Sequence, residues 1–315
     1  MTECFIGIDT SNYTTSAAIC TKDGEVVANL KLPLPVKAGE CGLRQSDAVF
    51  AHIKNLPTIM QSLAKKLEGM KPLAVGVSAM PRPQEGSYMP CFLSGIASAQ
   101  SFATAADIPL LRFSHQEGHI MAAAYSAGAM HLLEEERFAA FHVSGGTTEV
   151  LLVTTRENGF DIELFAATAD INAGQAIDRI GVMLGLAFPC GKELEKLALK
   201  NKKKIPKSRI SVKDGYCNLS GLENMATKLW DDTSDAALVA AYTQQFIADT
   251  LIAMTNELDA RIPSLPIVYA GGVMSNRYLQ SRLAERGNTY FAEPQFSADN
   301  AAGISLLCRK QFLKI

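Results

Sequence analysis

Two of the five histidines in this chain stand four residues apart, at His115 and His119 in the run HQEGH. Residues at this spacing share one face of a helix, so their imidazoles can bind one metal ion together. A carboxylate must complete such a site, and Asp299, in the turn FSADN before the last expected helix, is a candidate. Two histidines and one carboxylate leave coordination positions open and suit Fe(II) or Zn(II). The spacing also fits two ordinary surface or capping histidines.

The same run differs from a zinc-protease motif. In HExxH the glutamate directly follows the first histidine, whereas Glu117 lies midway between His115 and His119. No general base is therefore placed against the metal ligands, and a metalloprotease is the least favoured function.

Three turns rich in small residues could bind a phosphate group. In VSGG, residues 143–146, exposed N–H groups and glycine allow a ligand to approach the backbone closely. The opening turn, with Thr10, Ser11 and Asn12, would contact the same phosphate group from the first half of the chain. The turn AGGVMSN follows the apolar run LPIVYA and precedes an expected helix, and α/β sheets bind nucleosides or phosphates at such strand ends. Each turn alone also fits an ordinary hairpin.

Two further residues could line such a site. Asp178 lies on an otherwise apolar or small-residue helix, where its carboxylate accepts hydrogen bonds from ribose hydroxyls or faces solvent. Gly191 stands at a helix start, where it admits a ligand closely or is an ordinary loop glycine.

Strands alternating with helices must position these groups, which predicts an α/β fold with sheets covered on both faces. The spacing of Ser11 to Thr14-Thr15 recurs from Ser144 to Thr147-Thr148, at an offset of 133 residues. This self-similarity indicates two copies of one hairpin-led unit, although such turns are also common by chance. We expect a first lobe over residues 1–112, a second over 113–297, and a last helix, 298–315, packed back on the first.

Composition bounds the function classes. The chain has 315 residues, of which 48% are hydrophobic, and a net charge of −2, so bulk charge indicates neither nucleic acid nor membrane. Neither a signal peptide nor a membrane-spanning run is evident, and seven scattered cysteines without a CxxC pair indicate reduced thiols, so we expect a cytoplasmic protein. In residues 200–213 half of the 14 side chains are basic. We favour a solvated loop there over a phosphate contact, because the segment lacks aromatic residues for stacking.

The motifs GIDTS, HQEGH, VSGGTT, AIDRIGVMLGL, NLSGL, AGGVMSNR and FSADNAAGI occur in this order along nearly the whole chain. Together they resemble the Kae/TsaD family, formerly labelled glycoproteases or O-sialoglycoprotein endopeptidases. The resemblance implies an actin-like ASKHA fold of two RNase H-like lobes, each with a mixed sheet flanked by helices.

The resemblance also implies a function and a site. The reaction would transfer a threonylcarbamoyl group from threonylcarbamoyl-adenylate to N6 of the adenosine beside a tRNA anticodon. The cofactors would be ATP, AMP or an acyl-adenylate and a divalent metal, Fe(II) or Zn(II) with Mg(II) as a further option. Partners would be tRNA, a second ASKHA-type subunit and a small ATPase, with no membrane. The metal would be bound by His115, His119 and Asp299, and the nucleotide by His142, Val143, Ser144, Gly145, Gly146, Asp178, Gly191 and Asn276.

Four departures from the family pattern fall where the acceptor is expected. The opening loop has Asn12 and Tyr13 in place of CD, Thr147 replaces a histidine, Glu223 replaces a lysine, and residues 79–86 replace AGPG. We infer a divergent paralogue that keeps the nucleotide and metal motifs. A carbamoyltransferase with another acceptor, and a regulatory nucleotide-binding subunit of a TsaD-type complex, are the alternatives.

Overall fold

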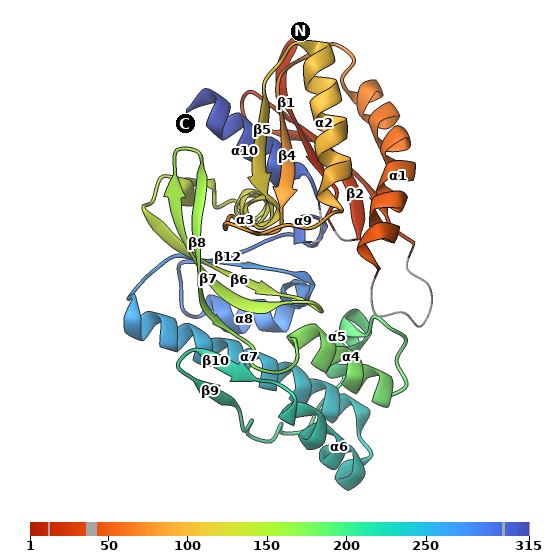
Figure 1. Ribbon diagram of the computed structural model, residues 1–315. Coiled ribbons are helices and arrows are strands. Elements are labelled where there is room, and N and C mark those ends of the chain that lie inside the picture. Colours follow the sequence, from red (N-terminus) through yellow and green to blue (C-terminus); the bar gives the residue numbers. More distant parts are fainter. Residues whose placement is uncertain (12, 36–42, 298–299, 315) are drawn as a thin grey trace. The chain divides into compact units, whose positions relative to one another are not determined.

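The structure, a computed structural model, describes residues 1–11, 13–35, 43–297 and 300–314 (Figure 1). Two predicted site residues, Asn12 and Asp299, lie outside these ranges. Mutual contacts divide the chain into two compact units. Unit 1 comprises Met1–Ser126, Thr155–Asp161 and Gln295–Ile315, and unit 2 comprises Ala127–Thr154 and Ile162–Pro294. The lobe limits expected from the sequence stay a prediction.

Unit 1 contains a mixed five-stranded sheet of order β3-β2-β1-β4-β5. Its strands are β1 (Thr2–Asp9), β2 (Thr14–Thr21), β3 (Val26–Pro33), β4 (Met70–Met80) and β5 (Leu110–Ser114). The first three form an antiparallel meander, and β4 and β5 run parallel to β1. Alternate residues of β1 face opposite sides. Ile6 and Ile8 pack with α1 (Gln45–Lys66) and α2 (Phe92–Ala106), whereas Gly7 faces α10 (Ala302–Leu313).

The contacts of α10 require glycine at several positions. A Cβ on Gly76 of β4 would lie 2.9 Å from the Ile304 carbonyl oxygen, and one on Gly303 would overlap the Gly118 carbonyl. Gly118 belongs to α3 (His115–Ser126), the helix that carries the two histidines. The last helix therefore packs directly against the sheet and against α3, and so holds α3 in place (Figure 1).

Unit 2 contains a second five-stranded sheet, of order β12-β11-β6-β7-β8. Its strands are β6 (Arg137–Val143), β7 (Thr148–Arg156), β8 (Gly159–Ala167), β11 (Ile267–Ala270) and β12 (Thr289–Phe291). Read from the other edge, this order repeats that of unit 1: a meander followed by two strands parallel to its first strand. The expected duplication is therefore confirmed in topology, and Ser11 and Ser144 follow corresponding strands.

The helices of unit 2 surround the long helix α7 (Ala236–Arg261), which begins where Asp235 accepts a hydrogen bond from Leu238 N at 3.1 Å. The remaining elements are η1 (Met130–Leu133), α4 (Ala173–Met183), α5 (Gly191–Ala198), β9 (Ser211–Lys213), β10 (Tyr216–Asn218), α6 (Gly221–Thr233), η2 (Gly272–Ser275) and α8 (Arg277–Ala284), with α9 (Pro294–Ser297) at the junction.

Three further expectations can be compared with the structure. Pro57 predicts an interruption of the helix that contains it, because proline lacks a backbone N–H. This prediction is wrong: α1 continues through Pro57, whose side chain is exposed. The six described cysteines are buried and free of disulfides, as expected. No helix in the described ranges is long and apolar enough to cross a membrane.

Candidate functional site

The two histidines of α3 face each other. The helix begins directly after β5, at the carboxyl edge of the parallel strands of unit 1. His115 Nε2 lies 2.9 Å from His119 Nε2. Two nitrogens that bind one ion at about 2.0–2.1 Å lie roughly 3 Å apart. The two rings are therefore hydrogen-bonded to each other at a separation close to that of two nitrogens on one ion.

A buried carboxylate fixes the first of these rings. Asp9, the last residue of β1, has one oxygen 2.8 Å from His115 Nδ1. That oxygen also accepts a hydrogen bond from the Ser78 hydroxyl, and the other accepts one from Ser11 N at 2.8 Å. Burial opposes ionisation of Asp9, but His115, Ser78 and Ser11 outweigh it and hold the pKa of this carboxyl below its ordinary value.

An ionised partner on Nδ1 orients an imidazole so that Nε2 remains for a metal. Asp9 was not among the predicted site residues, although an acid that ends a buried strand in GIDTS was an available signal.

These contacts do not include a third metal ligand. In the part of the chain that the structure describes, no three His, Cys, Asp or Glu side chains form a group that could hold a metal. The predicted third ligand, Asp299, lies outside that part. The imidazole pair and its carboxylate support nevertheless fit a nitrogen-binding divalent ion.

Glu117 is directed away from the histidine pair. One carboxylate oxygen accepts hydrogen bonds from Ser114 N and Ser114 Oγ, both at 2.7 Å, and the other accepts one from Phe160 N at 3.2 Å. A Cβ on Gly159 would overlap this second oxygen. Glu117 thus joins the start of α3 to the tip of the β7–β8 hairpin.

We expect Glu117→Gln to lower the free energy of unfolding by about 1–3 kcal/mol, because an amide offers only one acceptor oxygen to donors on both sides. Urea denaturation followed by circular dichroism would measure the change. The matched control is Glu68→Gln, an exposed glutamate of the same unit, for which we expect a change within about 0.5 kcal/mol. Equal stability of the two variants would contradict a structural role for Glu117.

The opening turn of unit 1 is largely internal. The buried Thr10 hydroxyl donates to Cys91 O and accepts from Gly95 N, both at 3.0 Å, so it joins the turn to the start of α2. Ser11 Oγ is buried and has no hydrogen-bond partner among the described residues. Of the predicted phosphate loop, Ser11 is thus the described residue whose hydroxyl a ligand could use, and Asn12 lies outside the described ranges.

In unit 2 two of the predicted nucleotide motifs lie side by side. VSGG follows β6 and AGGVMSN follows β11, and these strands pair in parallel with His142 opposite Ala270. Gly271 has a φ of +101°, and a Cβ there would overlap the Val143 carbonyl. Only glycine allows this approach, so Gly271 brings the two turns together.

The start of α4 packs against the VSGG turn. Gly174 N donates to Ser144 O at 3.1 Å, and a Cβ on Gly174 would lie 2.7 Å from Gly145 Cα. The Ser144 hydroxyl accepts hydrogen bonds from Gly146 N and from the N–H of the following residue, Thr147, at 3.2 and 3.1 Å. Gly174 and Gly271 were not predicted as site residues; a glycine beside a helix start or a strand end is the signal that could have found them.

The remaining predicted residues connect the helices at this edge. Asp178 Oδ1 accepts a hydrogen bond from Cys190 N at 2.7 Å and so fixes the start of α5. A Cβ on Gly191 would meet nothing within 4 Å, so its backbone borders open space. Asn276 Oδ1 accepts from Leu279 N at 3.1 Å and caps α8. The structure therefore places these residues on linked elements of unit 2, and nucleotide binding by them stays a prediction.

Two of the departures from the family pattern make contacts within the protein. Glu223 pairs with Arg179 of α4 at 3.1 Å, so the acid that replaces a lysine has a basic partner. In the loop that replaces AGPG, Pro81 O accepts from Gln116 N at 3.1 Å and so caps α3 beside His115.

Asp170 attaches the start of α6 to the β8–α4 loop. Burial opposes its ionisation, but hydrogen bonds from Leu219 N, Ser220 N, Ser220 Oγ and Ile171 N outweigh burial and lower the pKa to about 2. A folded-state pKa below the ordinary value of about 3.9 stabilises the fold above pH 4, and the stabilisation is lost as pH falls toward 2.

We therefore expect Asp170→Asn to be less stable than the wild type at pH 6, with the difference shrinking between pH 4 and 2. Fluorescence of Trp230, the chain's single tryptophan and a residue of α6, would report the unfolding. Ser220→Ala, which removes one donor, should give a smaller change of the same sign. A difference independent of pH would contradict the assignment.

The two duplicated sheets and their flanking helices define an actin-like ASKHA protein. Solved structures share this fold: HypF of T. kodakarensis aligns with a TM-score of 0.62 and 12% identity, over 99% of this chain and 48% of that one. A ROK family glucokinase from Streptomyces griseus, solved with glucose and AMPPNP, aligns with a TM-score of 0.54 and 13% identity, over 98% and 99% of the two chains.

Residues 39–306 match the model of the family described as TsaD, tRNA N6-adenosine threonylcarbamoyltransferase, and the chain belongs to that family. It is 32% identical to the tRNA N6-adenosine threonylcarbamoyltransferase of Magnetococcus marinus over 326 residues, covering 95% of this chain and 89% of the relative. Identity to a protein of the same name from Thermus thermophilus is 31% over 310 residues, covering 96% and 90%. The resemblance drawn from the motifs is thereby confirmed.

Proposed function

We propose that this chain transfers a threonylcarbamoyl group from an adenylate to N6 of a tRNA adenosine. The observation that carries the proposal is the close contact of the turns VSGG and AGGVMSN with each other and with α4, which glycine at positions 174 and 271 allows. The chain belongs to a family that is described as tRNA N6-adenosine threonylcarbamoyltransferase. Backbone N–H groups at a strand end and a helix start are suited to the phosphate of the adenylate.

In the proposed reaction the N6 amine attacks the carbamoyl carbon of the mixed anhydride. The bond from that carbon to the phosphate oxygen breaks, AMP leaves with the electron pair, and N6 loses one proton. The residues 144–146 and Gly191 would bind the donor, and Asp178 and Asn276 would offer oxygen or amide groups to its sugar or base. The N–H group of Gly145, which is exposed at this turn, would stabilise negative charge on the leaving phosphate.

The divalent metal of this proposal would be held by His115 and His119, with Asp299 as the third ligand. A bound Fe(II), Zn(II) or Mg(II) would neutralise phosphate charge as a Lewis acid. Within the chain, Asp9 keeps the His115 ring oriented, and Ser78 and Ser11 keep Asp9 ionised.

Two alternatives have different support. A regulatory, non-catalytic subunit is favoured by Glu223, because an acid paired with Arg179 stands where the family motif has a lysine. A metalloprotease is disfavoured, because Glu117 is bound to Ser114 and Phe160 and is therefore not available as a general base for metal-bound water.

Reconstitution tests the proposal. The chain is incubated with unmodified tRNA, threonine, bicarbonate, ATP, an adenylate-forming enzyme and its family partner subunits, and the nucleosides are analysed by mass spectrometry. We expect threonylcarbamoyladenosine to accumulate with the chain and not without it. Nucleotide binding without any product would instead support the regulatory alternative.

A further inference from the structure

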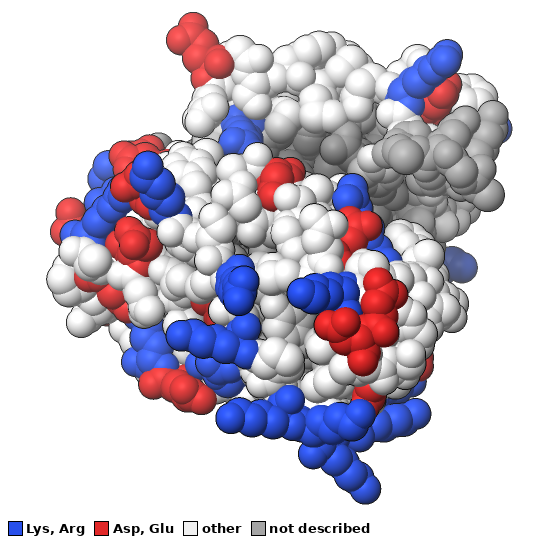
Figure 2. All heavy atoms as spheres, turned by 90° about the horizontal axis from the view of Figure 1, so that it is seen from below, with Lys and Arg blue, Asp and Glu red and all other residues white. Residues whose placement is uncertain are grey.

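The strongest feature that the proposed site does not use is a basic segment, residues 192–213, which covers most of α5, the following coil and β9. It contains nine of the chain's 30 basic residues and only two of its 32 acidic residues, so the remainder of the chain is net acidic. All nine basic side chains are exposed. Figure 2 shows Lys and Arg gathered along one edge of the face seen there.

The coil of the basic segment is held in place. Ile205 and Ile210 pack against the core of unit 2. Gln245 of α7 donates hydrogen bonds to Pro206 O at 2.8 Å and to Ser208 Oγ at 3.1 Å. Because these residues are fixed inward, the intervening lysines are presented outward from an ordered backbone, which lowers the entropy lost when they bind a ligand.

Most of the positive charge of the segment has no ion-pair partner among the described residues. Lys196 pairs with Glu193 at 2.7 Å, and Lys203 pairs with Asp235 at 2.8 Å. Lys202, Lys204 and Lys207 make no ion pair with any other described residue. A solvated surface normally intersperses both signs of charge, whereas residues 200–213 carry seven basic side chains and no acidic one. The two acidic residues of the segment, Glu193 and Glu195, lie in α5.

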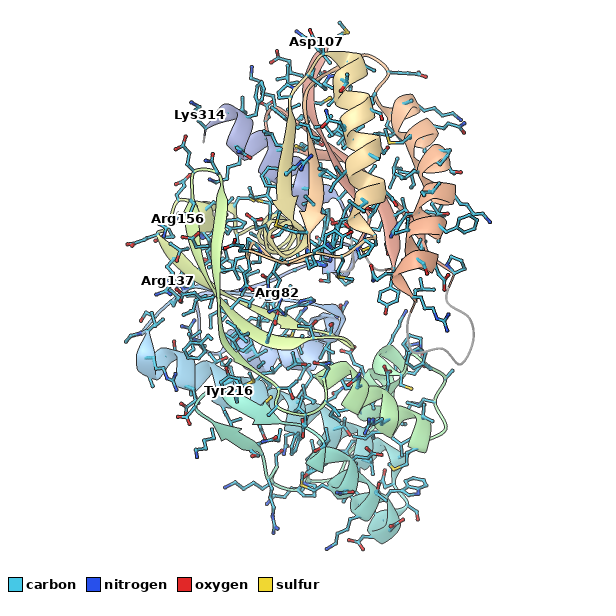
Figure 3. All side chains as sticks on the ribbon, in the orientation of Figure 1. Arg82, Asp107, Arg137, Arg156, Tyr216 and Lys314 are labelled. Carbon is cyan, nitrogen blue, oxygen red and sulfur yellow. The ribbon has the colours of Figure 1, made fainter. Side chains whose placement is uncertain are left out.

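Aromatic rings lie at both ends of the basic segment. Tyr216 of β10 pairs with Lys213 of β9 and is 43% exposed (Figure 3). Phe188, three residues before Gly191, is 75% exposed. The sequence alone favoured a solvated loop because no aromatic residue lies within 200–213; the fold supplies these rings from outside that stretch. Lysines combined with exposed rings suit RNA, since phosphates and bases are both contacted, better than an acidic protein.

The basic segment begins next to the proposed donor site. Lys192 is the second residue of α5, directly after Gly191, and α5 is fixed there by Asp178 through Cys190 N. An RNA lying along the segment would therefore pass the point where the adenylate is proposed to bind.

We propose that the basic segment binds the phosphate backbone of the acceptor RNA and that Tyr216 stacks on an unpaired base. This inference rests on the proposed function for the identity of the RNA. It names a surface on unit 2 that directs the acceptor toward Gly191.

The test uses the full chain and unmodified tRNA, with affinity measured by fluorescence anisotropy. The salt concentration is varied from about 50 to about 300 mM, because affinity that comes from phosphate contacts falls steeply over this range. We expect Lys202→Gln, Lys204→Gln and Lys207→Gln together to weaken binding about 10- to 100-fold and to lower the salt slope by about 2. The matched control, Lys65→Gln, Lys66→Gln and Lys71→Gln, makes the same charge change at exposed lysines of unit 1 and should leave both quantities unchanged.

A second variant separates stacking from charge. Tyr216→Ala should weaken binding about tenfold with an unchanged salt slope, and Tyr216→Phe should restore it. If the triple lysine variant binds tRNA like its control while the wild type still transfers the acyl group, the surface proposal is wrong and the proposed function stands. If wild-type binding of tRNA depends on the lysines but no acyl transfer occurs, the surface proposal stands and the proposed function is wrong. A triple variant that keeps its tRNA affinity but dissociates from its partner subunits would assign the segment to an acidic protein instead.

Discussion

Replacing His119 with alanine is expected to remove the metal from the purified protein and to lower the rate of acyl transfer by about 100-fold or more. His119 supplies one of two imidazole nitrogens that lie 2.9 Å apart, and Asp9 orients the other. A single remaining histidine on α3 cannot chelate. Metal content by plasma mass spectrometry and transfer from a preformed adenylate would measure the two effects.

The control for this variant is His131→Ala, because His131 is an exposed histidine of unit 2 whose Nε2 lies 3.0 Å from Tyr290 Oη. It should keep both metal and activity. Thermal unfolding of both variants would show whether His119→Ala is folded. A folded His119→Ala protein with the wild-type metal content would remove the histidine pair from the metal site.

The second large effect is expected at Gly271. Alanine there must adopt a positive φ and place its Cβ on the Val143 carbonyl, so we expect the free energy of unfolding of unit 2 to fall by about 2–5 kcal/mol. Nucleotide affinity should fall with it, because the turns after β6 and β11 are forced apart. Urea denaturation followed by Trp230 fluorescence reports on unit 2, where that residue packs against the core.

The adjacent glycine provides the control. A Cβ on Gly272 would meet nothing within 4 Å, and its φ is not in the left-handed range, so Gly272→Ala should change stability by less than about 1 kcal/mol. Similar losses for both variants would show that the turn tolerates displacement and that the close approach to Val143 is not needed.

The duplicated topology was predictable from the sequence because the turn spacing after Ser11 and Ser144 reports directly on two equivalent strand ends. The histidine pair was predictable because helical periodicity alone places positions 115 and 119 together. Both features follow from residues close together in the sequence, whose spacing decides which side chains share a face.

Local signals mark Asp9, Gly174 and Gly271 as residues at a strand end or a helix start, but they do not identify the groups that these residues contact, because those contacts join segments distant in sequence. Asp9 meets a histidine 106 residues later, and Gly271 meets a strand end 128 positions earlier. Likewise, the composition of residues 200–213 does not show that Tyr216 lies opposite Lys213, which follows from the pairing of β9 with β10. Composition describes a segment, whereas the pairing of strands decides which side chains surround it.

The measurement that tests the central claim most directly is a crystal structure of the chain with AMP or a non-hydrolysable ATP analogue bound. We predict that the phosphate lies against the turn of residues 144–146, with Gly191 beside the nucleoside and Asp178 and Asn276 within hydrogen-bond distance of the ligand. A nucleotide bound only elsewhere, or none at saturating concentration, would contradict the assignment of the donor site to unit 2.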